Sequence, residues 1–398
     1  MARRAHDTVA LTQKDLSRWR LVEAFQQRLA KAAATCSSLH PTWGDPQRLL
    51  QLADYLSLFL LGLLNPVVRT MRGLCRASRL ERVQEEICQR PVSLGSFSEA
   101  QHLLHPELLE KVFLDLAAQV SAPLDPHSLL AQRRWMARDG TLWRALPRMH
   151  WALYGGGKVG YANRAVRLHL SLHLLDDKPV QGQVRPGKDC ERAVWQEVWQ
   201  AGDAFVGDRY FGENYRLLGL LEGKKCAYVL RLRDQATISV EKELPVSCAD
   251  RAAGVVRQAW VRLGCRQRYQ SGRVRVVWIQ TPEQSLALVT NLDPEQLPAE
   301  LVSLLYRRRW QIELFFRWIK CILGCRHWLA ESPEGVTIQV YLALIAALLL
   351  QLYTGQRPTR RMMELIQFYL LGVATLEELW TGLEQEKARL ARKKIKKT

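Results

Sequence analysis

Apolar residues in the N-terminal third of the chain recur at the spacing of helices. Across residues 14–90 they return every three or four positions, and strand-like alternation is rare. The strongest segment, LLQLADYLSLFLLGLL, ends at Asn65-Pro66, a pair that stops a helix. RPVSLGSFSEA has the composition of a polar break, and a further helix is predicted over residues 106–120. The pattern predicts an all-helical N-terminal region.

Beyond residue 123 the period changes to that of strands. RRWMARDGTLW is predicted as a strand that ends at Asp139-Gly140. RAVRLHLSLHLLDD alternates like a strand with one solvated face, and KPVQGQVRPG is a third strand. A helix over residues 189–200, the strand AFVGD, a helix over ENYRLLGLLEG and the strand CAYVLRLR follow. This order predicts a mixed sheet with helices packed on it.

Residues 234–292 carry only strand patterns, with no predicted helix between them, and indicate an all-β insertion in an α/β domain. The fold class is therefore α/β, with N- and C-terminal helical regions beside a mixed sheet. The pattern predicts five segments along the chain. They are an N-terminal helical region, a first core segment, the β insertion, a second core segment and a C-terminal helical region with a basic tail: residues 1–122, 123–233, 234–292, 293–355 and 356–398.

The apolar segment VTIQVYLALIAALLLQLY, residues 336–353, approaches the length of a membrane span. It contains Thr337, Gln339 and Gln351, and no second span accompanies it. A helix that is apolar on all sides also suits the centre of a large domain. We expect a core helix and no membrane association.

The formal net charge is +18 and the isoelectric point is near 9.7, which favours a polyanionic partner. The cations are spread along the chain, as suits a protein that holds a long duplex over several surfaces; an inert basic surface is the plain alternative. The nine cysteines form no CxxC pair, so neither a disulfide framework nor a zinc ribbon is indicated. Cys321, Cys325 and His327 lack a second ligand pair, and reduced thiols are expected.

Residues 306–323, YRRRWQIELFFRWIKCIL, are predicted as part of one long helix with a cationic side and an apolar side. One stripe of that helix holds a single acid among cations and aromatic residues: Tyr306, Arg309, Trp310, Glu313, Arg317 and Lys320. The other side is apolar: Leu305, Ile312, Phe315, Phe316, Ile319 and Leu323. An ordinary ladder of surface ion pairs would explain the stripe. A nucleic-acid site explains it too, because interleaved aromatic and cationic residues serve base stacking and phosphate binding.

If Glu313 is functional, acidic partners should lie at strand ends. Asp139 ends the first predicted strand, where Gly140 permits a sharp exit, and Asp208 follows AFVG. Either aspartate could equally be a turn residue. Turn propensity in predicted loops explains three competitors: Asp176, Asp177 and Asp203. Three carboxylates from two adjacent strands and a helix can hold two hard cations, which stabilise the attacking and leaving oxygens of phosphoryl transfer.

The spacing Tyr306-x2-Arg309-x3-Glu313-x6-Lys320 resembles the YREK signature of bacterial DDE transposases of the IS-four family. Their other two acids lie in an Asp-Gly-Thr-like motif and an Asp-Arg-Gly-Phe-like motif, to which DGT at 139–141 and DRYF at 208–211 correspond. The resemblance covers residues 90–355, including the β insertion between the second aspartate and the glutamate. Tyr210 departs from the pattern, since the family often has glycine there.

The resemblance implies a ribonuclease-H-like core that cleaves and rejoins transposon ends with two Mg²⁺ ions, for which Mn²⁺ substitutes. By position, the metal ligands and catalytic residues would be Asp139, Asp208 and Glu313. The DNA-binding residues would be Tyr306, Arg309, Trp310, Arg317 and Lys320. Trp310 resembles the aromatic residue that stacks on a flipped base in hairpin-forming members, although it could simply pack, and Trp278 is a candidate for a second such residue.

The resemblance also implies partners: double-stranded DNA, as transposon ends and target, and a second copy of the chain in a homodimer. By the same analogy, residues 1–122 would bind the DNA ends and residues 356–398 would have a possible role in dimerisation. The expected location is cytoplasmic and nucleoid-associated. Two other functions remain open. One is a nuclease or junction resolvase on the same fold, which cuts without joining. The other is a catalytically silent DNA-binding protein descended from a transposase.

Overall fold

The computed structural model of the chain describes residues 20–68, 70–120, 128–152, 164–196, 199–265, 269–321 and 328–395. The chain forms two compact units, each discontinuous in sequence. We call the first the helical unit: Met1–Ser121, Trp143–Ala165 and Phe316–Thr398. We call the second the sheet unit: Ala122–Leu142 and Val166–Phe315.

The helical unit is built from N-terminal and C-terminal helices. Its described elements are α1 (Arg20–Ala34), η2 (Pro41–Gly44), α2 (Leu52–Leu64), α3 (Met71–Ala77), α4 (Glu81–Glu86), α5 (Leu94–Ala100), α6 (Glu107–Gln119), α14 (Pro333–Thr354), α15 (Arg360–Leu370) and α16 (Leu376–Ile395). The all-helical prediction holds over the described part of residues 20–120, and α2 ends at Asn65 as expected. The predicted polar break was wrong, because Ser93 caps α5 by accepting a hydrogen bond from the Ser96 N–H and Phe97 is buried.

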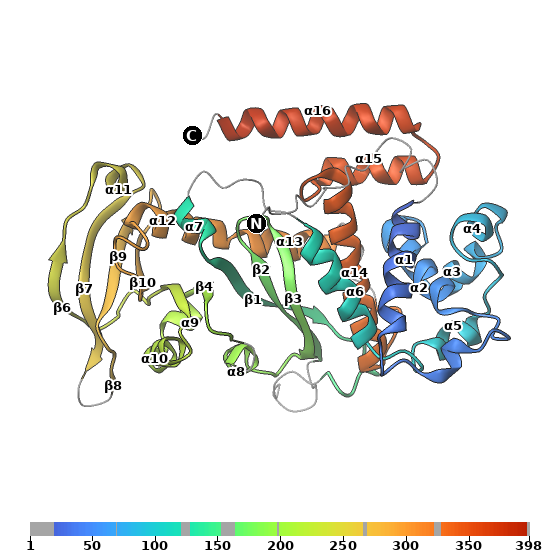
Figure 1. The fold of residues 1–398 in the computed structure, drawn as a ribbon, viewed down its shortest axis with the longest axis horizontal. Helices are drawn as coiled ribbons and strands as arrows, with labels where there is room; N and C mark the ends of the chain where they lie inside the picture. The colour runs from blue at the N-terminus through green and yellow to red at the C-terminus, as the bar shows by residue number, and fades with distance from the viewer. Residues whose placement is uncertain are drawn as a thin grey trace, which may run out of the picture. The chain divides into compact units, whose positions relative to one another are not determined.

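Helix α14 lies at the centre of the helical unit and packs against α1, α2 and α6 (Figure 1). By length and composition alone it could cross a membrane. In the structure 89% of its most apolar window is buried inside the protein, as expected of a core helix. Pro333 stands in its first turn behind the capping residue Ser332, and Gly355 ends it with a φ of 70°. The apolar surface of α14 is thus covered by neighbouring helices.

The sheet unit contains the described strands, apart from Trp143 and Arg144 at the end of β1 and Ala165 at the start of β2. They are β1 (Arg134–Arg144), β2 (Ala165–His173), β3 (Lys178–Pro186), β4 (Asp203–Gly207), β5 (Ala227–Arg231), β6 (Ile238–Leu244), β7 (Val255–Cys265), β8 (Tyr269–Gln270), β9 (Val274–Gln280) and β10 (Ser285–Thr290). Its described helices are α7 (Ser128–Ala131), α8 (Glu191–Gln196), α9 (Arg209–Gly212), α10 (Tyr215–Gly223), α11 (Cys248–Ala252) and α12 (Ala299–Arg309). Helix α13 (Gln311–Cys321) begins in the sheet unit and ends in the helical unit.

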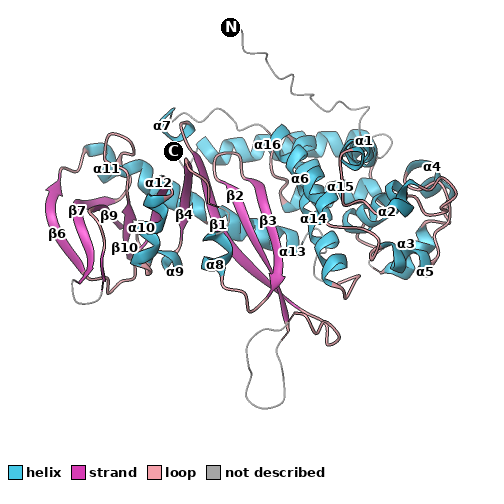
Figure 2. Cartoon of the chain, turned by 60° about the horizontal axis from the view of Figure 1, so that its bottom comes forward, coloured by secondary structure: helices cyan, strands magenta, loops and turns pink. Residues whose placement is uncertain are grey.

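The strands form one mixed sheet in the order β3-β2-β1-β4-β5-β10-β9-β7-β6, with β8 beside β7 (Figure 2). Strands β1, β4 and β5 run parallel, whereas β10 is antiparallel to β5 and begins an antiparallel series. The predicted α/β fold class with a mixed sheet is confirmed. The strands of residues 234–292 continue the core sheet, since β10 hydrogen-bonds directly to β5.

Three local predictions were wrong. Strand β2 is buried on both faces, because its polar side is covered: Arg167 pairs with Glu191, and the His169 ring meets Trp195. The short helix α11 interrupts the strands of residues 234–292, where Ser247 forms a capping box. Asp203 opens β4 and does not lie in a loop. Leu323, Cys325, His327 and residues 396–398 lie outside the described residues, and no side-chain description covers Cys321.

Candidate active site

Asp139 lies in the middle of β1, which continues to Arg144, so the predicted strand end at Asp139-Gly140 was wrong. Gly140 does not end the strand; it makes room for the side chain of Glu191. A Cβ atom at Gly140 would lie 2.5 Å from Oε1 of Glu191, a separation that packed atoms do not tolerate. The missing side chain therefore leaves room for a carboxylate beside Asp139. The Oδ1 atom of Asp139 accepts a hydrogen bond from the Gly140 N–H at 2.7 Å.

Asp208 follows β4 directly, as the sequence pattern predicted, and caps the short helix α9. Its Oδ1 atom accepts a hydrogen bond from the Tyr210 N–H at 3.0 Å. Strands β1 and β4 are parallel neighbours, with Ala137 opposite Val206. Asp139 and Asp208 each come two residues further along, so the two aspartates occupy adjacent positions across these strands.

Burial and like charges raise the pKa of Asp139 to about 7. Loss of hydration is the largest cause, followed by repulsion from Glu191; Asp208 adds repulsion, while the Gly140 N–H and Arg309 act in the opposite direction. Glu191 itself has a raised pKa, chiefly because of burial, which Arg167 opposes. A buried group of carboxylates with this electrostatic balance favours the binding of a cation.

Sequence reasoning missed Glu191. It occupies the first turn of α8, where an acidic residue is ordinarily explained by the helix dipole. Its Oε1 atom accepts a hydrogen bond from Nη1 of Arg167 at 2.5 Å, and both side chains are about 15% exposed. The intervals along the chain between Glu191 and the three predicted acids match none of the motifs in the sequence. Only the strand order brings α8 next to β1 and β2.

Glu313 lies in the first turn of α13 and is bound by Arg309. Nη2 of Arg309 donates a hydrogen bond to Oε1 of Glu313 at 2.8 Å, and the guanidinium lies 5.7 Å from the ring centroid of Tyr306. Arg309 also attracts Asp139 electrostatically. The guanidinium thus lies between the charges of Glu313 and Asp139, and the ion pair that the sequence allowed between Arg309 and Glu313 is present.

The predicted single long helix through residue 310 was wrong. Helix α12 ends at Arg309 with Trp310 as its cap, and α13 starts at Gln311. Helical hydrogen bonding resumes at once, since the Leu314 N–H donates to the Trp310 carbonyl. The predicted apolar side is buried at each of its described positions: Leu305, Ile312, Phe315, Phe316 and Ile319.

The remaining predicted DNA-binding residues have different environments. Trp310 is 49% exposed at the junction of α12 and α13. Arg317 is exposed on α13, and Lys320 places its Nζ atom 5.0 Å from the ring centroid of Trp143. Arg317, Lys320 and Trp143 belong to the helical unit, whereas the three acids belong to the sheet unit. Their contact with DNA stays a prediction.

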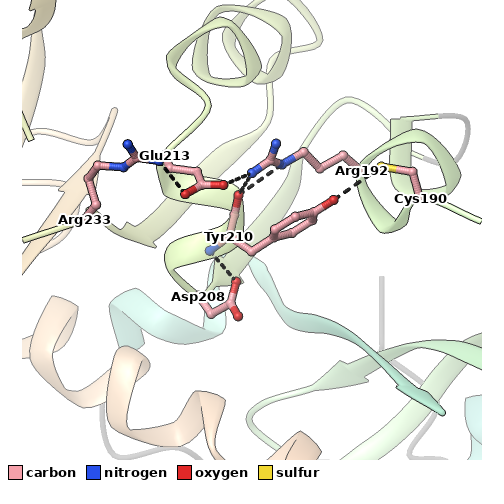
Figure 3. A network of polar contacts seen from close by, with 6 residues as sticks. All are labelled: Cys190, Arg192, Asp208, Tyr210, Glu213 and Arg233. Atoms are coloured by element: carbon pink, nitrogen blue, oxygen red, sulfur yellow. Dashed lines mark hydrogen bonds and ion pairs between the residues drawn. The ribbon is translucent and has the colours of Figure 1, made fainter. Parts of the chain in front are cut away.

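The segment after Asp208 is held by a polar network (Figure 3). The Arg192 guanidinium stacks on the Tyr210 ring at 3.9 Å, donates to the Tyr210 carbonyl, and donates to Glu213 at 2.7 Å. Glu213 also accepts a hydrogen bond from Arg233 at 2.7 Å. The Tyr210 hydroxyl lies 3.3 Å from Sγ of Cys190. Tyr210, the departure from the glycine of the resembling family, is therefore built into the fold.

The carboxylate oxygens of these acids are suitable ligands for a divalent cation. Their side chains, however, do not form a closed binding site. Carboxylate oxygens are the ligands that hard cations prefer, and Gly140 leaves a space that Glu191 fills. Within the described residues, however, no group of three or more His, Cys, Asp or Glu side chains is arranged to hold a metal ion. Glu313 faces Arg309, so the side chains are not gathered around one point.

Comparison with known proteins adds a family match over the same residues. A model of the transposase DDE domain matches residues 131–349. A protein named "Probable transposase for insertion sequence element IS5377", from Geobacillus stearothermophilus, is 27% identical over 205 residues, which cover 51% of this chain and 52% of that protein. The transposase for insertion sequence element IS421 from Escherichia coli is 37% identical over 78 residues, 19% of this chain and 21% of that one.

The matches to these relatives are partial. The chain matches about half the length of the first relative and about a fifth of the second. The solved structure of a piggyBac transposase synaptic complex with hairpin DNA covers 99% of this chain and 82% of its own, with a TM-score of 0.43 and 10% sequence identity. That distant likeness supports no conclusion about this chain.

Proposed function

This chain belongs to the transposase DDE domain family, and we propose that it is a DNA transposase. Its reaction would be the metal-dependent cleavage and strand transfer of DNA at the ends of an insertion sequence. One observation carries the proposal: Asp139 lies on β1, Asp208 directly follows the parallel neighbour β4, and Arg309 attracts both Glu313 and Asp139. That arrangement has two acids from neighbouring strands and a third from the helix that follows the sheet.

Proteins with this domain generally use divalent metal ions. We propose Mg²⁺, two ions, as the natural cofactor with Mn²⁺ as a substitute, held by Asp139, Asp208 and Glu313. Bound metal would polarise a phosphate oxygen and lower the pKa of the attacking water or hydroxyl. The raised pKa of Asp139 supports this assignment, since a nearby cation would relieve the like-charge repulsion.

The cations of α12 and α13 would bind the DNA backbone. Arg309 would supply positive charge beside Glu313, with which it pairs at 2.8 Å. Tyr306 and the exposed Arg317 would contact neighbouring phosphates, as would Lys320. Trp310 is exposed enough to stack on a distorted base. The partners proposed are double-stranded DNA and a second copy of the chain; this places the activity in the cytoplasm, at the nucleoid.

A transposition assay tests the proposal. Asp139→Ala, Asp208→Ala and Glu313→Ala are each expected to lose transposition by about 100-fold or more, because each removes a metal ligand. DNA binding measured in parallel should persist, since the basic residues remain. Normal transposition by all three variants would overturn the assignment. A wild-type protein that cuts but never joins a precleaved end would instead be a nuclease.

A further inference from the structure

The segment that follows β4 begins with Asp208 and then forms the helix α9, which is only four residues long. So short a helix has little stability of its own, and contacts with the rest of the fold must hold it in place. Oδ1 of Asp208 accepts a hydrogen bond from the Tyr210 N–H at 3.0 Å. The position of the Tyr210 backbone therefore affects where the Asp208 carboxylate points.

Arg192, in the first turn of α8, holds Tyr210 from outside this segment (Figure 3). Its Nε atom donates a hydrogen bond to the Tyr210 carbonyl at 3.0 Å, and its Nη2 atom donates to the same oxygen. The guanidinium carbon lies 3.9 Å from the centroid of the Tyr210 ring. Tyr210 thus accepts from Arg192 at its carbonyl and donates to Asp208 at its N–H.

Glu213 orients the Arg192 guanidinium in turn. Its Oε1 atom accepts a hydrogen bond from Arg192 at 2.7 Å, and its Oε2 atom accepts one from Arg233 at 2.7 Å. These hydrogen bonds, that of Arg233 first, hold the pKa of Glu213 below its usual range. Helix α9 also lies directly against β5, since a Cβ atom at Gly212 would lie 2.0 Å from the Arg231 carbonyl oxygen. The helix is therefore attached to both α8 and β5.

We propose that Arg192 is a positioning residue of the active site: it fixes the backbone of Tyr210 and, through the Tyr210 N–H, the direction of the Asp208 carboxylate. The inference rests on the proposed function, because it assumes that Asp208 takes part in DNA cleavage. A guanidinium suits this task, since its planar fork can donate to a carbonyl and a carboxylate while it stacks on a ring. A lysine would keep the charge and lose both the fork and the stacking.

Two other roles for Arg192 compete with positioning. It could bind a DNA phosphate, or it could only stabilise the fold. Phosphate binding is disfavoured, because the side chain is 21% exposed and already donates to the Tyr210 carbonyl and to Glu213. A residue that only stabilises the fold would not change the cleavage rate of a variant that stays folded.

Single-turnover cleavage of a DNA duplex that carries an end of the insertion sequence tests the proposal, with the dissociation constant for the same duplex measured separately. For Arg192→Lys we expect the rate to fall about tenfold or more, and the dissociation constant to stay within about twofold of wild type. Arg273→Lys is the matched control. Arg273 lies over the ring of Trp260 at 4.9 Å and pairs with Glu241 at 3.7 Å, and its substitution should leave the rate within about twofold of wild type.

Hydrogen–deuterium exchange gives a readout that does not depend on cleavage. In the protein without metal or DNA, the backbone amides of residues 209–213 should exchange about tenfold faster in Arg192→Lys than in wild type, because α9 loses its attachment to α8. Arg273→Lys should leave the exchange of these amides unchanged. Wild-type exchange of residues 209–213 in Arg192→Lys would overturn the inference.

The remaining outcomes separate the possible failures. Should circular dichroism show Arg192→Lys to be unfolded, Glu213→Gln removes the charge that orients Arg192, and a slower rate is still expected. A wild-type rate in the folded variant overturns the inference, and so does a loss confined to DNA affinity. If Asp208→Asn is inactive while Arg192→Lys cleaves normally, only the role of Arg192 fails. If Asp208→Asn cleaves like wild type, or wild type does not cleave the duplex, the proposed function fails and the inference fails with it.

Discussion

Several charged side chains of β1, β2 and β4 are enclosed by the fold, whereas those of β6 and β7, at the other end of the sheet, lie at the surface. Arg138 of β1 and Asp203 of β4 pair at 3.2 Å with side chains 2% and 10% exposed. Arg257 of β7 and Glu243 of β6 form the same kind of pair at 47% and 56% exposure. Water screens the exposed pair of Arg257 and Glu243. The buried charges of Arg138 and Asp203 are stabilised by each other. Strands β1 and β2 accordingly carry ionisable groups with strongly altered pKa values: Arg138, Asp139 and His169.

The largest expected effect separates the two pairs. Asp203→Asn leaves the buried Arg138 guanidinium without a counter-charge and should lower the free energy of unfolding by about 3–5 kcal/mol. Glu243→Gln breaks the exposed pair and should lower the free energy of unfolding far less, because water screens that pair. Urea unfolding followed by circular dichroism measures both. Equal losses would show that burial does not distinguish the two regions.

Asp139→Asn should stabilise the metal-free protein at pH 8, although it removes a proposed catalytic residue. The folded protein holds the Asp139 proton up to about pH 7, whereas an unfolded aspartate releases it near its ordinary value of 3.8. Wild-type stability is therefore lost as pH rises from about 4 to 7, and the variant escapes a penalty on the order of 2–4 kcal/mol.

Melting temperatures in EDTA between pH 4 and 8 measure the effect of Asp139→Asn. The difference in melting temperature between Asp139→Asn and wild type should grow as the pH rises. Asp234→Asn is the matched control, because it removes an aspartate whose side chain is 66% exposed. A gap that stays constant with pH would indicate a packing effect in place of charge burial.

The smallest of these effects concerns His169, buried in β2 with neither ring nitrogen hydrogen-bonded among the described residues. Burial lowers its pKa to about 4, helped by Arg167 and Arg185. An unfolded histidine takes up a proton near pH 6.5, so wild-type stability should fall by about 2–3 kcal/mol as pH drops from 6.5 to 4.

His169→Leu should remove that acid-dependent loss. Urea unfolding at pH 7.5 measures how much the substitution changes the free energy of unfolding through packing. The change in that difference between pH 7.5 and pH 4.5 then measures the effect of protonating His169. If the difference is the same at both pH values, His169 does not titrate differently in the folded chain.

The hydrophobic pattern located most elements because burial leaves a local signature. Helix α2 ends at Asn65 and strand β4 precedes Asp208, as predicted. The errors concern places where a distant contact overrides the local signal. Strand β1 continues through Gly140, where Glu191 packs closely against the glycine, and the predicted polar break at residues 90–100 contains α5, with Phe97 buried.

The sequence by itself determined the family through the spacing of Tyr306, Arg309, Glu313 and Lys320, and it determined the element types, because both are written in intervals along the chain. Only the tertiary structure decided that residue 191 meets residue 140. The strand order β3-β2-β1-β4 decides that contact, and strand order depends on pairing between segments far apart in the chain. The contact of Glu191 with Gly140 is therefore visible in the fold and not in any local pattern.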